Sequence, residues 1–110
     1  MYTIEGQKVT LTRGDTFKVE VGMKSSVDGS TYTPVEGDVI KFGLKKYPED
    51  EELLVTKTIP NNTRLLHLAP ADTASLDFGR YHYDIEITLE NGDKDTFINN
   101  QEFWIAPEVV

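Results

Sequence analysis

The sequence predicts an all-β protein in which two antiparallel sheets pack face to face. Apolar and polar residues alternate with a period of two in several short segments, most clearly from Tyr81 to Leu89. Turn signals rich in Gly, Pro, Asn and Asp separate these segments at spacings of about 8 to 12 residues, and no segment keeps a long helical period. These observations indicate a sandwich of about seven or eight short strands.

The chain length is that of one domain. The 110 residues can bury roughly 60% or more of the unfolded chain's surface around one core, so we expect residues 1–110 to form a single domain. The chain has no cysteine, which excludes disulfides and thiolate chemistry. The two sheets are therefore expected to be held together by packing alone.

Alternation predicts five strands before residue 70. The second is the clearest, because Phe17, Val19 and Val21 alternate with Lys, Glu and Gly. Turn sequences such as Arg13-Gly14-Asp15 separate the strands. The expected strands are Lys8–Thr12, Thr16–Met23, Asp38–Lys46, Leu53–Ile59 and Thr63–Leu68.

The remaining third of the chain contains a helical turn and the last strands. Ala69–Leu76 is expected to form a short helix, since its proline suits a first helical position. The strand Tyr81–Leu89 follows, and Asn91-Gly92 supplies a tight hairpin turn. Lys94–Ile98 returns antiparallel. Glu102–Ile105 is either a final short strand or the continuation of the preceding one.

The entry into the Tyr81 strand has a recognisable spacing. Asp77-x-Gly79-x-Tyr81-x-Tyr83 matches the tyrosine corner that opens strand F of immunoglobulin-type sandwiches, with Tyr83 where those domains place their second cysteine. The sequence therefore predicts an immunoglobulin-like sandwich with a short helical turn before the corner. The Tyr81 hydroxyl is expected to bond backbone near Asp77 or Leu76.

Residues on the inward faces of these strands form the predicted core. They are apolar, and their neighbours along each strand are mostly polar. The predicted core consists of Val9, Leu11, Phe17, Val19, Val21, Ile40, Phe42, Leu44, Leu66, Leu68, Tyr81, Tyr83, Ile85, Ile87, Phe97 and Phe103.

Charge and hydropathy argue against two classes of partner. The net charge is −8 and the 11 basic residues are scattered. A negatively charged protein without a basic patch repels a polyanion, so no nucleic acid is expected as a partner. No apolar run approaches the roughly 20 residues of a membrane span, so no membrane partner is expected. The first residues lack the charged and apolar regions of a signal peptide, and we expect synthesis in a cytoplasm.

The sequence shows no pattern typical of a catalytic site. His67 and His82 lie on separate predicted strands, with no nucleophile at a supporting spacing. Asp93 and Asp95 lack the ligand order of a calcium loop and suit a hairpin tip. The acidic run Glu49–Glu52 suits a solvated surface. We therefore expect no catalytic residue, no cofactor and no metal, and predict that the protein is not an enzyme.

The segment around Trp104 is the best candidate for a binding surface. Strand alternation sends Phe103 and Ile105 one way and Trp104 the other, which leaves one large apolar surface outside the core. An exposed tryptophan beside an edge strand is typical of interfaces. Trp104, Phe103, Tyr47 and Tyr32 are the predicted partner-binding residues. In the alternative, the chain bends and Trp104 packs on its own sheet.

Five segments, taken in order, carry a family resemblance: Lys8–Asp15, Gly37–Phe42, Leu66–Thr73, Phe78–Ile85 and Asn91–Phe97. They resemble the small β-sandwich proteins encoded in the tail and baseplate region of prophages in Gram-positive bacteria, and are similar to the N-terminal domain of phage baseplate upper proteins. The resemblance implies an immunoglobulin-like, non-enzymatic virion component that is synthesised in the bacterial host cytoplasm and joins other tail proteins. It carries no catalytic residues.

Two functions of different classes follow. The leading hypothesis is a structural or adaptor component of a phage tail or baseplate, located in the virion, which self-associates or is captured by another tail protein through a sheet edge near Trp104. The alternative is a carbohydrate-binding sandwich that stacks host-surface glycan on Trp104, Tyr32 or Tyr47. Loss of glycan binding in Trp104→Ala would favour the alternative.

Overall fold

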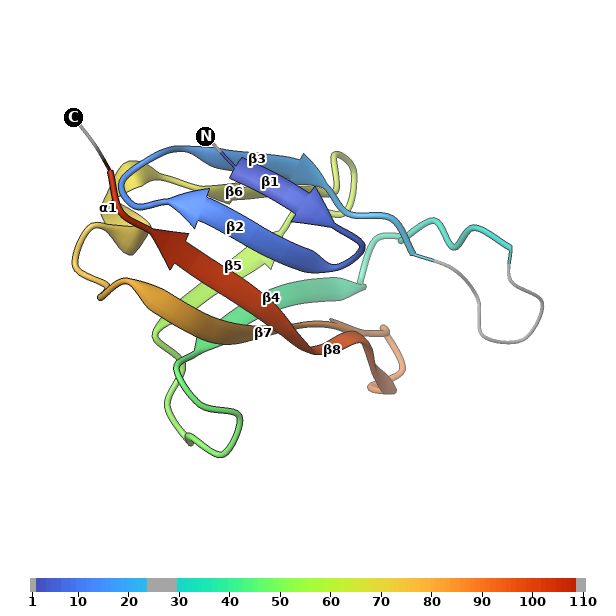
Figure 1. Cartoon of the computed structure of the whole chain (residues 1–110). Helices are drawn as coiled ribbons and strands as arrows, with labels where there is room; N and C mark the ends of the chain where they lie inside the picture. The colour runs from blue at the N-terminus through green and yellow to red at the C-terminus, as the bar shows by residue number, and fades with distance from the viewer. Residues whose placement is uncertain (1, 24–29, 109–110) are drawn as a thin grey trace.

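The computed structural model describes residues 2–23 and 30–108, which fold as two β-sheets packed face to face (Figure 1). The larger sheet has six strands in the order β1-β2-β8-β7-β4-β5, and the smaller sheet pairs β3 with β6. The all-β sandwich prediction is confirmed. The elements are β1 (Tyr2–Glu5), β2 (Lys8–Thr12), β3 (Phe17–Glu20), β4 (Val39–Lys45), β5 (Val55–Ile59), β6 (Leu65–Leu68), α1 (Pro70–Thr73), β7 (Gly79–Thr88) and β8 (Lys94–Ala106).

One strand pair departs from the antiparallel prediction. β2 runs parallel to the C-terminal part of β8, with Val9 opposite Phe103 and Thr10 opposite Trp104. Parallel neighbours need a long connection between them, and here most of the chain separates the two strands. The other strand pairs of the described segments are antiparallel.

β1 is a strand that the sequence analysis did not predict. It forms a hairpin with β2 through a two-residue turn, in which Glu5 pairs with Lys8 and Gly6 has a φ of 62°. A positive φ is easily adopted by glycine, and it suits the tight turns that join antiparallel strands. The signal was present, since Tyr2 and Ile4 alternate with Thr and Glu immediately before this glycine.

The two predicted segments Lys94–Ile98 and Glu102–Ile105 belong to one strand, β8. Residues 94–106 form one continuous strand, so the segment at Glu102 continues the preceding one. Its pairing with β7 slips twice, because Tyr83 lies opposite Gln101 whereas Ile85 lies opposite Ile98 and Glu86 opposite Thr96. Such β-bulges insert an extra residue and redirect side chains. The first bulge contains Asn99 and Asn100.

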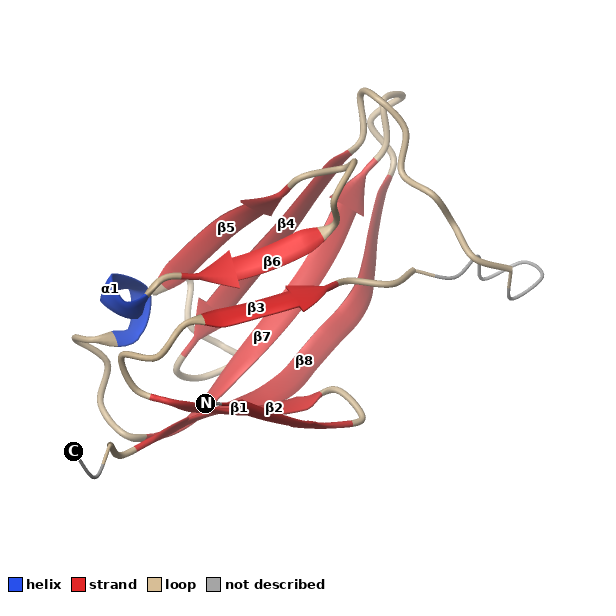
Figure 2. Cartoon of the chain, turned by 90° about the horizontal axis from the view of Figure 1, so that it is seen from above, coloured by secondary structure: helices blue, strands red, loops and turns tan. Residues whose placement is uncertain are grey.

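The core lies between the two sheets. Figure 2 shows β3 and β6 lying over the larger sheet, with α1 at one end of β6. The predicted core residues are buried, except that Val19 and Phe97 are partly buried against it. Phe97 coincides with the second register slip of β8, which disturbs the alternation there. The prediction missed Met23, Val55, Ile59 and Ile105, which are also buried.

Two tyrosine hydroxyls fasten β7 to the rest of the fold. Tyr81 Oη donates to the backbone oxygen of Asp77 at 2.8 Å, which confirms the predicted hydroxyl bond. Tyr83 Oη donates to the backbone oxygen of Gln7 at 2.5 Å, so Tyr83 connects β7 to the β1–β2 turn. Tyr83 occupies the position at which immunoglobulin domains have their second cysteine. Membership of the immunoglobulin-like class stays a prediction.

Candidate functional site

Trp104 lies on the outer face of the six-stranded sheet, as the alternation predicted. Its neighbours Phe103 and Ile105 point into the core and are 0% and 2% exposed, whereas Trp104 is half-buried. Phe103 packs edge-on against Phe17 and Phe42, with ring centroids 5.7 and 6.2 Å apart. Phe103 is therefore a core residue, and its assignment to a partner-binding surface does not fit the structure.

The predicted sheet edge beside Trp104 is wrong. The part of β8 that contains Trp104 lies inside the sheet, with Thr10 of β2 on one side and Arg80 of β7 on the other. The sequence could not show this, because the parallel partner of β8 comes from the beginning of the chain. Any partner of Trp104 would meet the face of the sheet and not its edge.

An open hollow of about 450 Å³ surrounds the outer side of Trp104. Small residues next to the indole leave this space, since Thr10 is its cross-strand neighbour and Ala106 follows two residues later on the same face. We call it the Trp104 hollow; Lys8, Thr10, Phe78, Trp104, Ala106 and Pro107 line it. Phe78 is 45% exposed, so the hollow presents two aromatic rings to solvent.

Polar side chains beside the indole pair with one another. Trp104 Nε1 donates to Glu102 Oε2 at 3.4 Å, and Arg80 forms an ion pair with the other oxygen of Glu102 at 3.5 Å. The Lys8 ammonium lies 5.8 Å from the centroid of the Trp104 ring, within cation–π range. These contacts favour the observed orientation of the indole, which lowers the entropy cost of using it in a contact.

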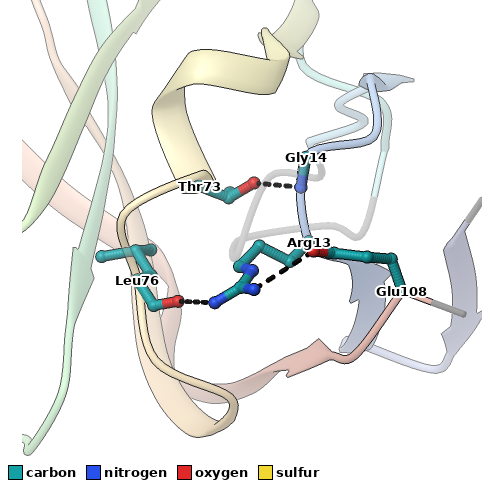
Figure 3. Close-up of polar contacts among 5 residues, drawn as sticks. All are labelled: Arg13, Gly14, Thr73, Leu76 and Glu108. Carbon is teal, nitrogen blue, oxygen red and sulfur yellow. Dashed lines mark hydrogen bonds and ion pairs between the residues drawn. The ribbon is translucent and has the colours of Figure 1, made fainter. Parts of the chain in front are cut away.

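Arg13 contacts Phe78, one of the residues that line the Trp104 hollow, and Figure 3 shows its bonds to Leu76 and Glu108. Its guanidinium donates to the backbone oxygen of Leu76 at 3.4 Å and to Glu108 Oε1 at 3.1 Å. The same guanidinium lies 4.1 Å from the centroid of the Phe78 ring, and the Arg13 amide donates to the oxygen of Ala106 at 2.9 Å. One side chain thus joins the β2–β3 turn, the segment before β7 and the segment after β8.

The turn next to Arg13 is fixed by α1. The Gly14 amide donates to Thr73 Oγ1 at 3.0 Å, and Thr73 is fully buried (Figure 3). The Arg13 hydrogen bond holds the pKa of the Glu108 carboxyl below its ordinary value. Both contacts stabilise the segments that meet at Arg13.

Tyr32 is occupied by a contact within the fold. Its hydroxyl donates to Asp38 Oδ2 at 2.7 Å, and the same oxygen accepts from the Val35 amide at 3.0 Å. This bond raises the pKa of Tyr32 and lowers the pKa of Asp38. Asn61 also donates to the backbone oxygen of Asp38 at 2.6 Å. Tyr32 therefore fastens the segment before β4.

Tyr47 is exposed but separate from Trp104. It follows the C-terminal end of β4, is 55% exposed, and does not line the Trp104 hollow. Tyr32 precedes the other end of the same strand. The structure does not bring Tyr32, Tyr47 and Trp104 together, so they form no shared platform for a sugar chain.

The two histidines lie on different sheets. His67 is on β6 opposite Lys18, whereas His82 is on β7 between Lys45 and Glu102. They form no dyad. Within residues 2–23 and 30–108, no group of three or more His, Cys, Asp or Glu side chains is arranged to hold a metal ion.

No helix in the described part of the chain is long and apolar enough to span a membrane. No protein-family model, no curated protein and no solved structure matches the chain.

Trp104 could be predicted from the sequence as part of this site, whereas Phe78 and Arg13 were not predicted. The outward position of Phe78 could have been predicted, because residues at intervals of two share a face of a strand and Phe78 is in step with the polar residues Arg80 and His82. The role of Arg13 could not have been predicted, because its partners Leu76 and Glu108 lie 63 and 95 residues away in the sequence.

Proposed function

We propose that the protein is a non-enzymatic structural or adaptor component of a phage tail or baseplate, and that it acts through protein–protein contacts at the Trp104 hollow. One observation carries the proposal: Trp104 is held on the outer face of the sheet, and it shares an open, mostly apolar hollow with the exposed Phe78. Tryptophan is enriched among the residues that dominate binding energy at interfaces.

The surroundings of the hollow favour a preformed docking surface. Glu102 accepts a hydrogen bond from the Trp104 indole, and Arg13, which contacts the Phe78 ring, pairs with Glu108, so few ordering costs remain when a partner binds. A polar rim around an apolar centre is typical of protein interfaces. The family resemblance supplies the setting, because such sandwiches join other tail proteins.

The proposal is tested by capture of tail proteins encoded beside this gene. The purified protein is immobilised, each neighbouring tail protein is passed over it, and the dissociation constant is measured. We expect one of them to bind, and Trp104→Ala to weaken that binding by about tenfold or more, as for a central interface tryptophan.

Tyr47→Ala is the matched control, since Tyr47 is an exposed aromatic residue outside the hollow. It should bind as the wild type does. The proposal is wrong if no neighbouring tail protein binds, or if Trp104→Ala binds like the wild type while Tyr47→Ala does not.

A further inference from the structure

A second hollow, of about 250 Å³, lies on the outer face of the same sheet at the first β-bulge of β8. It is separate from the Trp104 hollow, because the two share no lining residue. We call it the bulge hollow; its lining includes Lys45, Pro48, Leu53, Asp84, Asn99 and Asn100, together with Gly43 and His82.

Gly43 and the β4–β5 loop build one side of the bulge hollow. An added Cβ at Gly43 would lie 2.8 Å from Leu53 Cδ2, so the loop rests on a position that has no side chain. The Leu54 amide donates to the backbone oxygen of Leu44 at 2.7 Å, which holds the loop in this place. Leu53 and Pro48 therefore form an apolar wall above the polar outer face of the sheet.

The bulge itself builds the other side. Asn100 has a φ of 51°, and its amide donates to Asp84 Oδ1 at 2.5 Å. Non-glycine residues rarely adopt this backbone conformation, although asparagine tolerates it better than most. The bulge places Asn99 and Asn100 on the rim of the hollow, where both side-chain amides can donate and accept hydrogen bonds.

The hollow combines donors and acceptors that the protein itself leaves unused. Among the described residues, the Lys45 ammonium has no ion-pair partner, and Asp84 accepts only through the oxygen that faces Asn100. His82 Nδ1 is buried without a hydrogen-bond partner in the described structure, although buried polar atoms are normally satisfied. The two charged residues of the lining, Lys45 and Asp84, have opposite signs, so neither sign of ligand charge is matched by the lining as a whole.

We infer that the bulge hollow binds the pyranose ring of a neutral hexose. Each sugar hydroxyl both donates and accepts, which matches a carboxylate, an ammonium and two amides around one space. The C–H face of the ring suits the wall of Leu53 and Pro48. A further hollow of about 240 Å³ shares Gly43, Lys45, Leu53 and Asp84 with the bulge hollow, so a linked second sugar has room to bind beside the first.

The inference is tested by titrating the full chain with D-glucose, D-galactose, D-mannose and the disaccharide cellobiose, followed by two-dimensional amide NMR. At least one sugar should cause saturable shifts at the amides of Leu53, Asp84 and Asn100. Glycine, a zwitterion of similar polarity, should cause none. Saturable shifts with glycine alone, or no saturable shift at these amides with any of the four sugars, overturn the inference.

Two variants locate the site. Asn99→Ala and Lys45→Met each remove one hydrogen-bonding group from a partly or fully exposed position, and each should weaken sugar binding by about tenfold. Lys18→Met on β3 is the matched control and should bind as the wild type does. Thermal unfolding of the three variants should match the wild type. Unchanged binding in both site variants contradicts the inference.

Sugar binding in the bulge hollow should not depend on the Trp104 hollow. Trp104→Ala should leave the sugar titration unchanged, because Trp104 does not line the bulge hollow. Sugar-induced shifts confined to the Trp104 indole would overturn the bulge site.

Discussion

The two faces of the six-stranded sheet are made by the same strands but have opposite characters. On the inner face, Phe103 is fully buried and its ring contacts Phe17, Phe42 and Tyr83. On the outer face, the next residue, Trp104, is half-buried beside an open hollow. Because alternate residues of a strand point to opposite faces, one strand can stabilise the fold and present a binding surface at the same time.

The largest expected effect belongs to the inner face. Phe103→Ala removes a ring that three other aromatic rings contact, and it should lower the free energy of unfolding by about 3 to 5 kcal/mol, as for other buried phenylalanines. Urea denaturation followed by fluorescence measures this change. A loss below about 1 kcal/mol would mean that the inner cluster is not the core of the fold.

Tyr83 also belongs to the inner face, and its burial should make the free energy of unfolding depend on pH. Tyr83→Phe leaves the backbone oxygen of Gln7 without its partner and should cost about 1 to 3 kcal/mol of unfolding free energy at neutral pH. Burial raises the pKa of Tyr83 to about 12. A free tyrosine ionises near pH ~10, so the folded state holds the phenol proton more tightly than the unfolded state does.

The sign of the pH effect follows from this difference. The contribution of Tyr83 is fully present below about pH 10 and is lost as the pH rises toward 12, with a total of about 2 kcal/mol. Burial raises the pKa of Tyr81 as well, so the slope in the Tyr83→Phe variant should be shallower and not absent. Urea denaturation at several alkaline pH values tests this. Equal slopes in wild type and variant would show that Tyr83 is accessible to solvent.

Arg13 should have an intermediate effect, since it joins three segments at the rim of the outer face. Arg13→Met removes its bonds to Leu76 and Glu108 and should cost about 1 to 2 kcal/mol of unfolding free energy. Arg80→Met is the control: Arg80 makes one exposed ion pair with Glu102, and such pairs contribute about 0 to 1 kcal/mol. Equal losses in both variants would contradict the joining role of Arg13.

Gly43→Ala should change the outer face with little effect on the fold. The new methyl group would meet the end of the Leu53 side chain, which is 48% exposed and can move away. The unfolding free energy should change by less than about 1 kcal/mol, while the amide NMR signals of residues 47–54 shift. A loss of several kcal/mol would mean that Leu53 is fixed as firmly as a core residue.

Most of the fold could be predicted from the sequence because its determinants are local. The strand Lys8–Thr12 was predicted with the bounds that the structure gives, and the predicted hydroxyl bond of Tyr81 is present. The other four strands predicted before residue 70 were two to four residues too long, since alternation continues beyond the paired residues. β1 was missed, although Gly6 marks its turn.

The binding surfaces could be predicted only in part, because they depend on contacts between distant residues. Alternation placed Trp104 on the outer face, but nothing local showed that β2 would cover the neighbouring edge. The bulge at Asn99 and Asn100 depends on the pairing register with Asp84. Tyr32 was predicted as a binding residue, but its hydroxyl is bonded to Asp38 within the fold.

The most direct test of the division between the two faces is the free energy of unfolding of Trp104→Ala. Trp104 has polar cross-strand neighbours, and pairs on one face of a sheet contribute about 0.2 to 1 kcal/mol. We therefore expect Trp104→Ala to lose about 1 kcal/mol or less in urea denaturation, far less than Phe103→Ala. A loss of about 3 kcal/mol or more would show that Trp104 is a structural residue, and would contradict the account.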